Sequence, residues 1–336
     1  MPDPIPPRRA EAARWSRRSV LVLGMAAVVG SAGCTLDDPT SRAGRTPGSP
    51  VPTSRPSRPA TAADAAAELV LAGQAGALLT HGSRLSDRQR ALLQLIRGTH
   101  LERATALASP DPATRPIASA GPTPSPVPTP PARSLAALAD AERKAAAGYR
   151  RRALAASGLD ALLWGSMSVA GTRFGAGLDA ARPPAVGART DHRPITLLSD
   201  TDAVSALVAA LQAAVYGYQL ALGRLRVTSR EHARAAAGLR ERRGLLNRLS
   251  NRLIAAGVDV PAAAPAYDPS PEVRDAATAG RLIRRMESAL LPFCGLWLAA
   301  AARGGDRRQA FDALATTAAT AASWGAPLIA WPGWQD

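Results

Sequence analysis

From about residue 61 onward, apolar residues recur at steps of three and four, the spacing that places them on one face of an α-helix. The clearest stretch has seven such positions: Val204, Val208, Leu211, Val215, Tyr218, Leu222 and Leu225. No segment shows the strict alternation of apolar and polar residues that a half-buried strand requires. The pattern therefore predicts an all-α protein.

Eight segments follow this pattern. The predicted helices cover roughly 62–80, 86–107, 134–156, 158–180, 200–226, 230–256, 271–302 and 306–323. Four of them start at residues whose side chains can accept hydrogen bonds from free backbone N–H groups, or at a proline that suits a first turn. These starts are Thr61 with Asp64, Ser86 with Gln89, Thr228 with Glu231, and Ser270 before Pro271.

The connections divide the eight helices into two sets of four. Within each set, short turns join the first helix to the second and the third to the fourth. The second connection is long in both sets: a Pro-rich loop at 109–132 and the stretch GVDVPAAAPAYDPS at 257–270. A long second connection is typical of ferritin-like four-helix bundles, because the chain must travel back along the bundle. We therefore expect two tandem ferritin-like four-helix bundles, at 61–182 and 200–336, joined by a linker at 183–199.

Aromatic residues at helical spacing are interpreted as core side chains rather than as a cofactor site. This group comprises Trp164, Phe174, Phe293 and Trp297. The last residues, WGAPLIAWPGWQD, contain too much proline and glycine for a helix. Trp331 and Trp334 in this Trp-rich tail are expected to fold back over an open end of the second bundle.

The N-terminal segment has the order of an export signal. Five arginines precede an apolar run of about 15 residues from Ser19 to Gly33, which is shorter than the roughly 20 residues of a membrane-spanning helix. The pair Arg17 and Arg18 resembles the twin-arginine export motif, whose cargo crosses the membrane already folded. An ordinary secretory leader with adjacent arginines is the alternative.

Cys34 follows the apolar run directly, behind the small residues Ser31, Ala32 and Gly33. The segment resembles a lipobox, whose cysteine is lipidated and becomes the mature N-terminus, although lipoboxes usually carry Leu, Val or Ile where this chain has Ser31. A plain cleaved signal is the alternative. Residues 1–33 are thus predicted to be a lipoprotein signal peptide, which places the protein at the outer face of the cell membrane. More than one acyl chain on Cys34 would give a stable anchor.

Composition agrees with an envelope protein on a tether. Residues 34–60 are rich in Pro, Ser, Thr and Arg and predict a disordered tether. The chain has a formal net charge of +15. Removing residues 1–33 takes away five arginines and two acidic residues, which leaves +12. That charge favours anionic lipid or acidic wall polymers, whereas no nucleic-acid recognition motif or aromatic platform is present.

Polar residues in the second bundle form a candidate cluster. We expect the following side chains to face its interior, as a structural clasp or as contacts to a ligand: Gln212, Tyr216, Tyr218, Arg242, Arg243 and Glu287. A buried Arg–Glu pair is the expected feature, because a buried charge is costly unless it is paired. Cys294, the one cysteine besides Cys34, has apolar neighbours and is predicted to be a buried, inert thiol.

The second half resembles the ferritin-like domain of uncharacterised actinobacterial lipoproteins. The resemblance covers about residues 200–330 and rests on LQAAVYGYQLALGRL, ARAAAGLRERRGLLNRL, GVDVPAAAPAYDP and RRMESALLPFCGLWL. Its most specific features are the pair Tyr216 and Tyr218 and the Pro-rich turn that ends in Tyr267. Relatives of this domain often carry Glu-His ahead of the tyrosine pair, where this chain has Leu211 and Gln212. The first half resembles the same fold only in its layout.

The residues that iron chemistry needs are missing from the expected places. A di-iron bundle uses glutamates from two helices and Glu-x-x-His from the other two, and Glu-x-x-His occurs nowhere in this chain. His100 is in phase with Leu93 and Ile96, so it can face the first bundle's interior, but Arg97 precedes it by three residues. We therefore expect no bound metal and no cofactor.

No catalytic arrangement emerges, such as a Gly-rich phosphate loop or a nucleophile elbow. The sequence predicts a non-enzymatic, membrane-anchored lipoprotein whose bundle binds an envelope protein or a small ligand. The alternative is a ferritin-like metal-binding oxidoreductase or a metal-storage protein.

Overall fold

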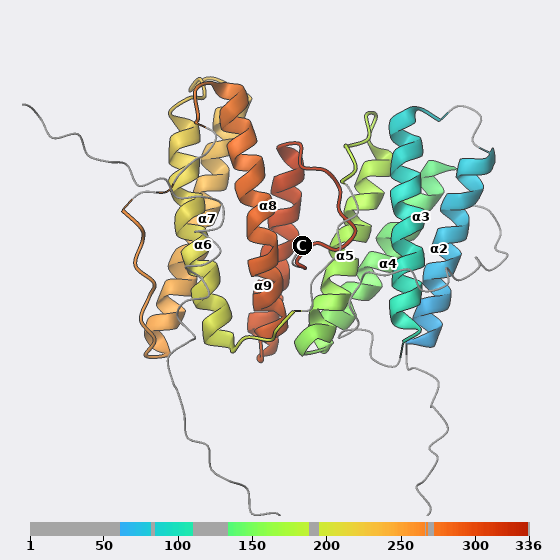
Figure 1. Cartoon of the computed structure of the whole chain (residues 1–336), viewed down its shortest axis with the longest axis horizontal. Helices are drawn as coiled ribbons and strands as arrows, with labels where there is room; N and C mark the ends of the chain where they lie inside the picture. The colour runs from blue at the N-terminus through green and yellow to red at the C-terminus, as the bar shows by residue number, and fades with distance from the viewer. Residues whose placement is uncertain are drawn as a thin grey trace, which may run out of the picture. The chain divides into compact units, whose positions relative to one another are not determined.

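The structure is a computed structural model that describes residues 61–81, 85–109, 134–187, 195–265, 267 and 272–334. The described residues form eight α-helices and no strand beyond an isolated bridge (Figure 1). The all-α prediction is confirmed. The predicted leader, the tether and most of the Pro-rich loop 109–132 lie outside the described residues.

The helices fall into two sets of four, as predicted. The first set is α2 (Ala62–His81), α3 (Asp87–Leu107), α4 (Leu135–Ala155) and α5 (Gly158–Asp179). The second is α6 (Asp200–Leu222), α7 (Arg230–Ala255), α8 (Ala276–Ala300) and α9 (Gly304–Ser323). Each set has its long connection between the second and third helices, which is the layout of ferritin-like bundles.

Of the four predicted helix starts, one has the expected cap and two are shifted. At the fourth, the hydroxyl of Thr61 donates to the carbonyl of Leu107. Ser86 and Gln89 form the expected capping box at α3. The cap of α7 is Ser229, one residue after Thr228, and its side chain accepts from the backbone of His232. Helix α8 starts five residues later than predicted, because Asp275 forms a reciprocal capping box with Thr278.

Each bundle has an apolar core, and a third cluster spans both bundles. In the first bundle, Leu93, Leu138 and Phe174 belong to one cluster. In the second, Tyr218, Leu239 and Ile283 belong to another. The third cluster joins side chains of α5 to those of α6, α8 and α9. The two bundles therefore share part of one hydrophobic core rather than packing as independent modules.

The predicted core aromatics mostly lie in these clusters. Trp164, Phe174 and Trp297 are buried, and Phe293 is half-buried against the shared cluster.

Arg307 provides a polar contact between the bundles, because its guanidinium donates to the carbonyl oxygens of Leu154 at the end of α4 and of Ala301 and Ala302 beyond α8. A cation is favourable at helix C-termini, where carbonyl groups lack helical partners.

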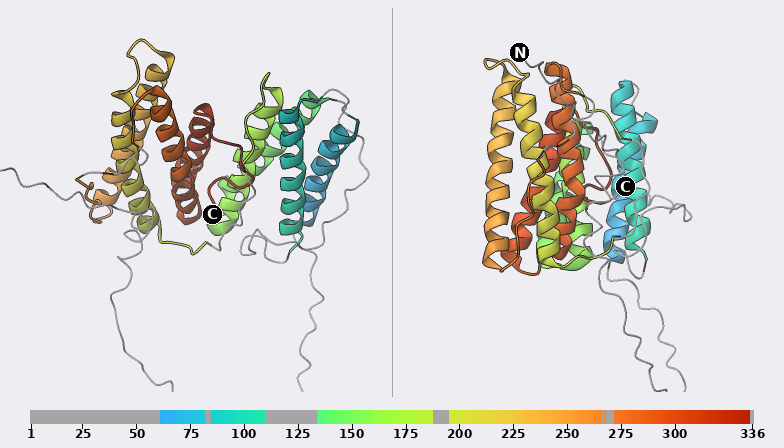
Figure 2. Two further views of the ribbon diagram at one scale, coloured as in Figure 1. Left: turned by 45° about the horizontal axis from the view of Figure 1, so that its top comes forward. Right: turned by 60° about the vertical axis from the view of Figure 1, so that its left-hand side comes forward.

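The C-terminal segment 326–334 runs between α5 and α9 (Figures 1 and 2). Leu328 pairs with the backbone after α5: Gly187 donates to Leu328 at 2.8 Å, and Leu328 donates to Ala185 at 2.9 Å. Trp331 and Trp334 are buried, as expected for side chains that fold back onto the protein. They do not cover a bundle end, however, because this segment lies along the helices and contacts both bundles.

Helices α2 and α6 are long and apolar enough to cross a membrane by length and composition alone. Core helices of water-exposed proteins meet the same criterion. Both helices carry buried polar residues that pair with neighbouring helices, Glu68 on α2 and Tyr218 on α6. We therefore interpret them as bundle helices.

A glycine on α8 allows the closest approach of the C-terminal segment. A Cβ atom on Gly295 would lie 1.9 Å from the carbonyl oxygen of Gly333 and 2.6 Å from its carbonyl carbon. Gly333 itself has φ +96°, a conformation that favours glycine. The backbone of the segment therefore lies directly on α8 at a point where no side chain fits.

We predict that Gly295→Ala displaces segment 326–334 and lowers the free energy of unfolding by about 1–3 kcal/mol, the range for overpacking a core. Denaturant unfolding followed by tryptophan fluorescence measures this loss. The matched control is Gly305→Ala at the start of α9, where an added Cβ meets nothing within 4 Å. Equal stability of the two variants would contradict the close contact.

Candidate functional site

Each bundle buries a cluster of charged and phenolic side chains. The first-bundle cluster consists of Glu68, His100, Arg103, Glu142 and Tyr149. The second-bundle cluster consists of Tyr218, Arg242 and Glu287. All eight side chains are less than a tenth exposed. These clusters lie where a four-helix bundle places inward-facing functional groups.

His100 is the centre of the first-bundle cluster. Its Nδ1 lies 2.6 Å from Oε2 of Glu68, and its Nε2 lies 2.7 Å from Oε1 of Glu142. The hydroxyl of Tyr149 donates to the other oxygen of Glu68. Three helices, α2, α3 and α4, thus meet around one imidazole ring.

The two carboxylates favour a protonated His100. Burial alone would lower the pKa of His100, but Glu142 and Glu68 raise it to about 9. Burial alone would likewise raise the pKa of Glu68, yet His100, Arg103 and Tyr149 hold it below its usual value. Two carboxylates and two cations therefore balance in charge within the bundle.

Arg103 links this cluster to the C-terminal segment. Its Nη1 lies 3.9 Å from Glu68, and its Nη2 donates to the carbonyl of Ala330 at 3.2 Å. The guanidinium also lies 5.8 Å from the ring centre of Phe174 and 5.4 Å from that of Trp331. Contacts of this kind stabilise a buried guanidinium.

The second-bundle cluster is a two-point ion pair with a phenol. Arg242 donates from Nε to Oε1 of Glu287 at 2.9 Å and from Nη2 to Oε2 at 2.6 Å. Tyr218 donates to the same Oε1 at 2.7 Å. Burial and the carboxylate of Glu287 both raise the pKa of Tyr218. Burial opposes the charge of Arg242, but Glu287 outweighs it and raises the arginine's pKa. This geometry is the strong, bidentate form of the pair.

The structure brings together three of the six residues expected in this cluster and separates the others. Gln212 donates to the carbonyl of Pro261 at 2.7 Å. The ring of Tyr216 lies 5.5 Å from that of Tyr267, centre to centre. Both residues thus hold the long connection between α7 and α8. Arg243 is exposed and faces away from the interior.

The remaining predicted residues lie elsewhere. Cys34, Arg17 and Arg18 are outside the described residues. Cys294 is buried, and burial raises the pKa of its thiol to about 11, so the side chain is a packed, inert thiol. Arg97 is exposed, and His100 faces the interior as its helical phase indicated.

The sequence interpretation did not find the carboxylates of the first-bundle cluster, although their phase was readable. Glu68 follows Ala65 and precedes Leu71 and Ala72 on one helix face. Glu142 stands four residues after Leu138 and seven before Tyr149, again on an otherwise buried face. The signal that identifies Glu68 and Glu142 is an acidic residue at a helix position where the spacing predicts an apolar side chain.

The clusters are arranged for ion pairing rather than for metal coordination. Among the described residues, no group of three or more His, Cys, Asp and Glu side chains is positioned to hold a metal ion. Both ring nitrogens of His100 are engaged by carboxylates, and Arg242 occupies both oxygens of Glu287. A ligand imidazole must be neutral, with one nitrogen available to the metal.

Comparison with known proteins finds a match to a family model over part of the second half only. Residues 203–336 match the model of DUF4439, a domain of unknown function. The crystal structure of a conserved hypothetical protein, rv2844, from Mycobacterium tuberculosis is 29% identical to this chain and covers 37% of it and 93% of its own length. Its TM-score is 0.36. No curated protein matches the chain.

We predict that stability falls as the pH rises from about 7 to above 9. The folded protein holds the proton on His100 with a pKa of about 9, against 6.5 for the ordinary group. The resulting contribution is complete below pH 6.5 and is lost as the pH rises through 9, with a loss on the order of 3 kcal/mol. Urea unfolding at a series of pH values measures it. A His100→Gln variant should lack this part of the slope, and an equal slope in both proteins would contradict the assignment.

We also predict that Glu287→Gln costs about 3–5 kcal/mol, because it leaves the Arg242 cation buried without a carboxylate. Replacing both partners, as Arg242→Met with Glu287→Leu, should cost less than the single change. Chemical denaturation of the variants gives the comparison. The exposed neighbour Glu241 provides the control, since Glu241→Gln should change stability by no more than about 0.5 kcal/mol. If Glu287→Gln and Glu241→Gln are equally stable, Glu287 does not neutralise a buried Arg242 cation.

Proposed function

We propose that this chain is an exported lipoprotein, anchored at the outer face of the cell membrane through lipidated Cys34. Its helical bundles act as a binding module for an envelope protein or a small ligand and catalyse no reaction. The proposal combines the order of the N-terminal sequence with the chemistry of the bundle interiors.

The observation that carries the binding role is the closure of both buried clusters by ion pairs. In metal-dependent bundles, the inward-facing carboxylates and imidazoles remain available to the metal. Here His100 lies between two carboxylates, and Glu287 is held by Arg242 at two points. Such clusters position helices and specify packing, which suits a rigid scaffold that presents its outer surface. No observation on the described residues favours an oxidoreductase or a metal-storage protein.

The sequence supports the location. An arginine-rich start, an apolar run too short to span a membrane and Cys34 stand in the order of a lipoprotein signal. Residues 34–60 would then tether the bundles to the membrane surface. The positive charge that remains after residue 33 favours anionic partners in the envelope.

We predict that Cys34→Ala releases the exported protein from the membrane, because the acylated cysteine is the anchor. The full chain is expressed in a host that processes bacterial lipoproteins, and the membrane pellet and soluble envelope fraction are compared by immunoblot. The second cysteine gives a matched control: Cys294→Ala should stay with the membrane, since that thiol is buried in α8.

Two further outcomes complete this test. Changing Arg17 and Arg18 together to lysine should leave an unprocessed precursor inside the cell if export follows the twin-arginine route. Unchanged membrane attachment after Cys34→Ala would overturn the lipoprotein proposal.

A further inference from the structure

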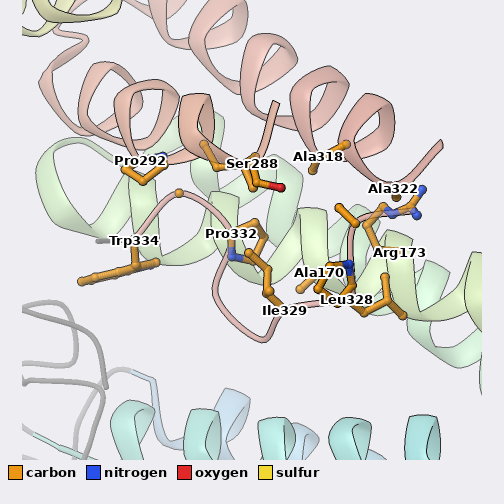
Figure 3. Close-up of a pocket in the computed structure, with 15 residues that line it drawn as sticks. Ala170, Arg173, Ser288, Pro292, Ala318, Ala322, Leu328, Ile329, Pro332 and Trp334 are labelled. Atoms are coloured by element: carbon orange, nitrogen blue, oxygen red, sulfur yellow. The ribbon is translucent and has the colours of Figure 1, made fainter. Parts of the chain in front are cut away.

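A partly enclosed pocket lies between the two bundles (Figure 3). Its walls come from α5, α8, α9 and segment 326–334, and its volume is about 180 Å³. An apolar cavity of roughly 150 Å³ is large enough to bind benzene. The pocket is therefore of a size for a small organic molecule.

The lining is apolar except for three side chains. Alanine, leucine, isoleucine, proline and glycine residues make up most of it, including Ala170 and Leu328. The polar side chains are those of Arg173, Ser288 and Trp334. No acidic residue is among the described residues that line it. An apolar pocket with few polar groups is the usual form of a small-molecule site.

Two of these polar side chains have buried donors without acceptors. Nε of Arg173 and Nε1 of Trp334 are both shielded from solvent and have no hydrogen-bond partner among the described residues. Burial lowers the pKa of Arg173, and within the part of the chain that the structure describes no carboxylate offsets the effect. A buried N–H group without an acceptor is costly, and the partly buried guanidinium of Arg173 adds a positive charge, so an acceptor within reach of these groups would be bound favourably.

The pocket offers donors and one positive charge, so its ligand must accept hydrogen bonds and carry a negative charge. The apolar walls require a hydrocarbon body, and a single arginine matches one carboxylate through its planar pair of N–H groups. We infer that this pocket binds a small apolar monocarboxylate, of about the size of benzoate, with its carboxylate on Arg173. The inference rests on the proposed binding role but not on the membrane anchor.

Such a ligand would act at the junction of the bundles. It would contact α5 of the first bundle, α8 and α9 of the second, and the C-terminal segment that joins them. Because a ligand that binds only the folded state stabilises it, the carboxylate would raise the melting temperature of the whole unit.

The test uses the purified full chain with three probes: benzoate, benzamide and inorganic phosphate. Benzamide has the shape of benzoate without its charge, and phosphate has charge without an apolar body. Ligand-observed NMR and thermal unfolding are measured across a concentration series. We expect saturable benzoate binding at about millimolar concentration or below, and binding of the other two probes that is weaker by about tenfold or more.

Arg173→Met should weaken benzoate binding by about tenfold or more, since it removes the cation and keeps an apolar side chain. Arg240→Met is the matched control, because Arg240 is an exposed arginine on α7 outside the pocket. This variant should bind benzoate with the same affinity as the unmodified chain. If Arg173→Met fails to fold, the comparison of benzoate with benzamide on the unmodified chain decides.

Three results would overturn the inference: no benzoate binding at about 10 mM, far above the expected range, equal affinity for benzamide or phosphate, or unchanged benzoate affinity in a folded Arg173→Met variant. None of them bears on membrane attachment, which the Cys34 variant tests separately. A failed ligand assay and a failed anchor assay therefore lead to different conclusions.

Discussion

Charge neutralisation inside the helical bundles is the constraint on which the rest of the structure depends. A carboxylate or guanidinium that leaves water must find its partner within hydrogen-bonding distance, or the fold loses several kcal/mol. In this protein the partners come from different helices, so neutralisation also fixes how the helices lie against one another. The imidazole of His100 can bridge two carboxylates only when α2, α3 and α4 all contribute.

Both bundles meet this constraint with the same layout and different side chains. The second helix supplies a cation, His100 or Arg242, and the third supplies a carboxylate, Glu142 or Glu287. A tyrosine completes each cluster, from α4 in the first bundle and from α6 in the second. The first bundle adds a second carboxylate and a second cation, and the latter reaches the C-terminal segment. The two clusters thus take their cation and their carboxylate from equivalent helices, and both clusters hold the helices of their bundle together.

The sequence predicted the helices and three members of one of the two clusters, Tyr218, Arg242 and Glu287. Helical spacing and capping residues located all eight helices. The start of α8 moved to the stronger cap at Asp275, whereas α6 ends four residues earlier than predicted, at Leu222. A buried Arg–Glu pair was predicted because a buried charge needs a partner, and the structure shows that the arginine is Arg242 rather than Arg243. In the first bundle, helical phase identifies His100 as inward-facing but not its carboxylates. The Glu-x-x-His pattern concerns a single helix, whereas Glu68 and Glu142 stand at apolar phases of two other helices.

Contacts between segments far apart in the chain could not be predicted by such local reasoning. Segment 326–334 reads as an irregular tail, and nothing in its composition indicates that Leu328 pairs beside Ala185 or that Trp331 lies next to Arg103. The shared core likewise depends on which helix faces remain apolar after each bundle has formed. Those faces are set by three-dimensional packing, which periodicity along one helix does not specify.

The position of this segment also sets an order of events during synthesis. Protein domains generally begin to fold from the N-terminus while the chain is still being made. Here the residues that complete the junction between the bundles follow all eight described helices in the chain, so the junction can close only after those helices have been made. A product that stops just after α9 would retain all eight described helices and lack the segment that joins the two bundles. Joining of the two bundles is therefore a later step than the formation of their helices, and it depends on segment 326–334.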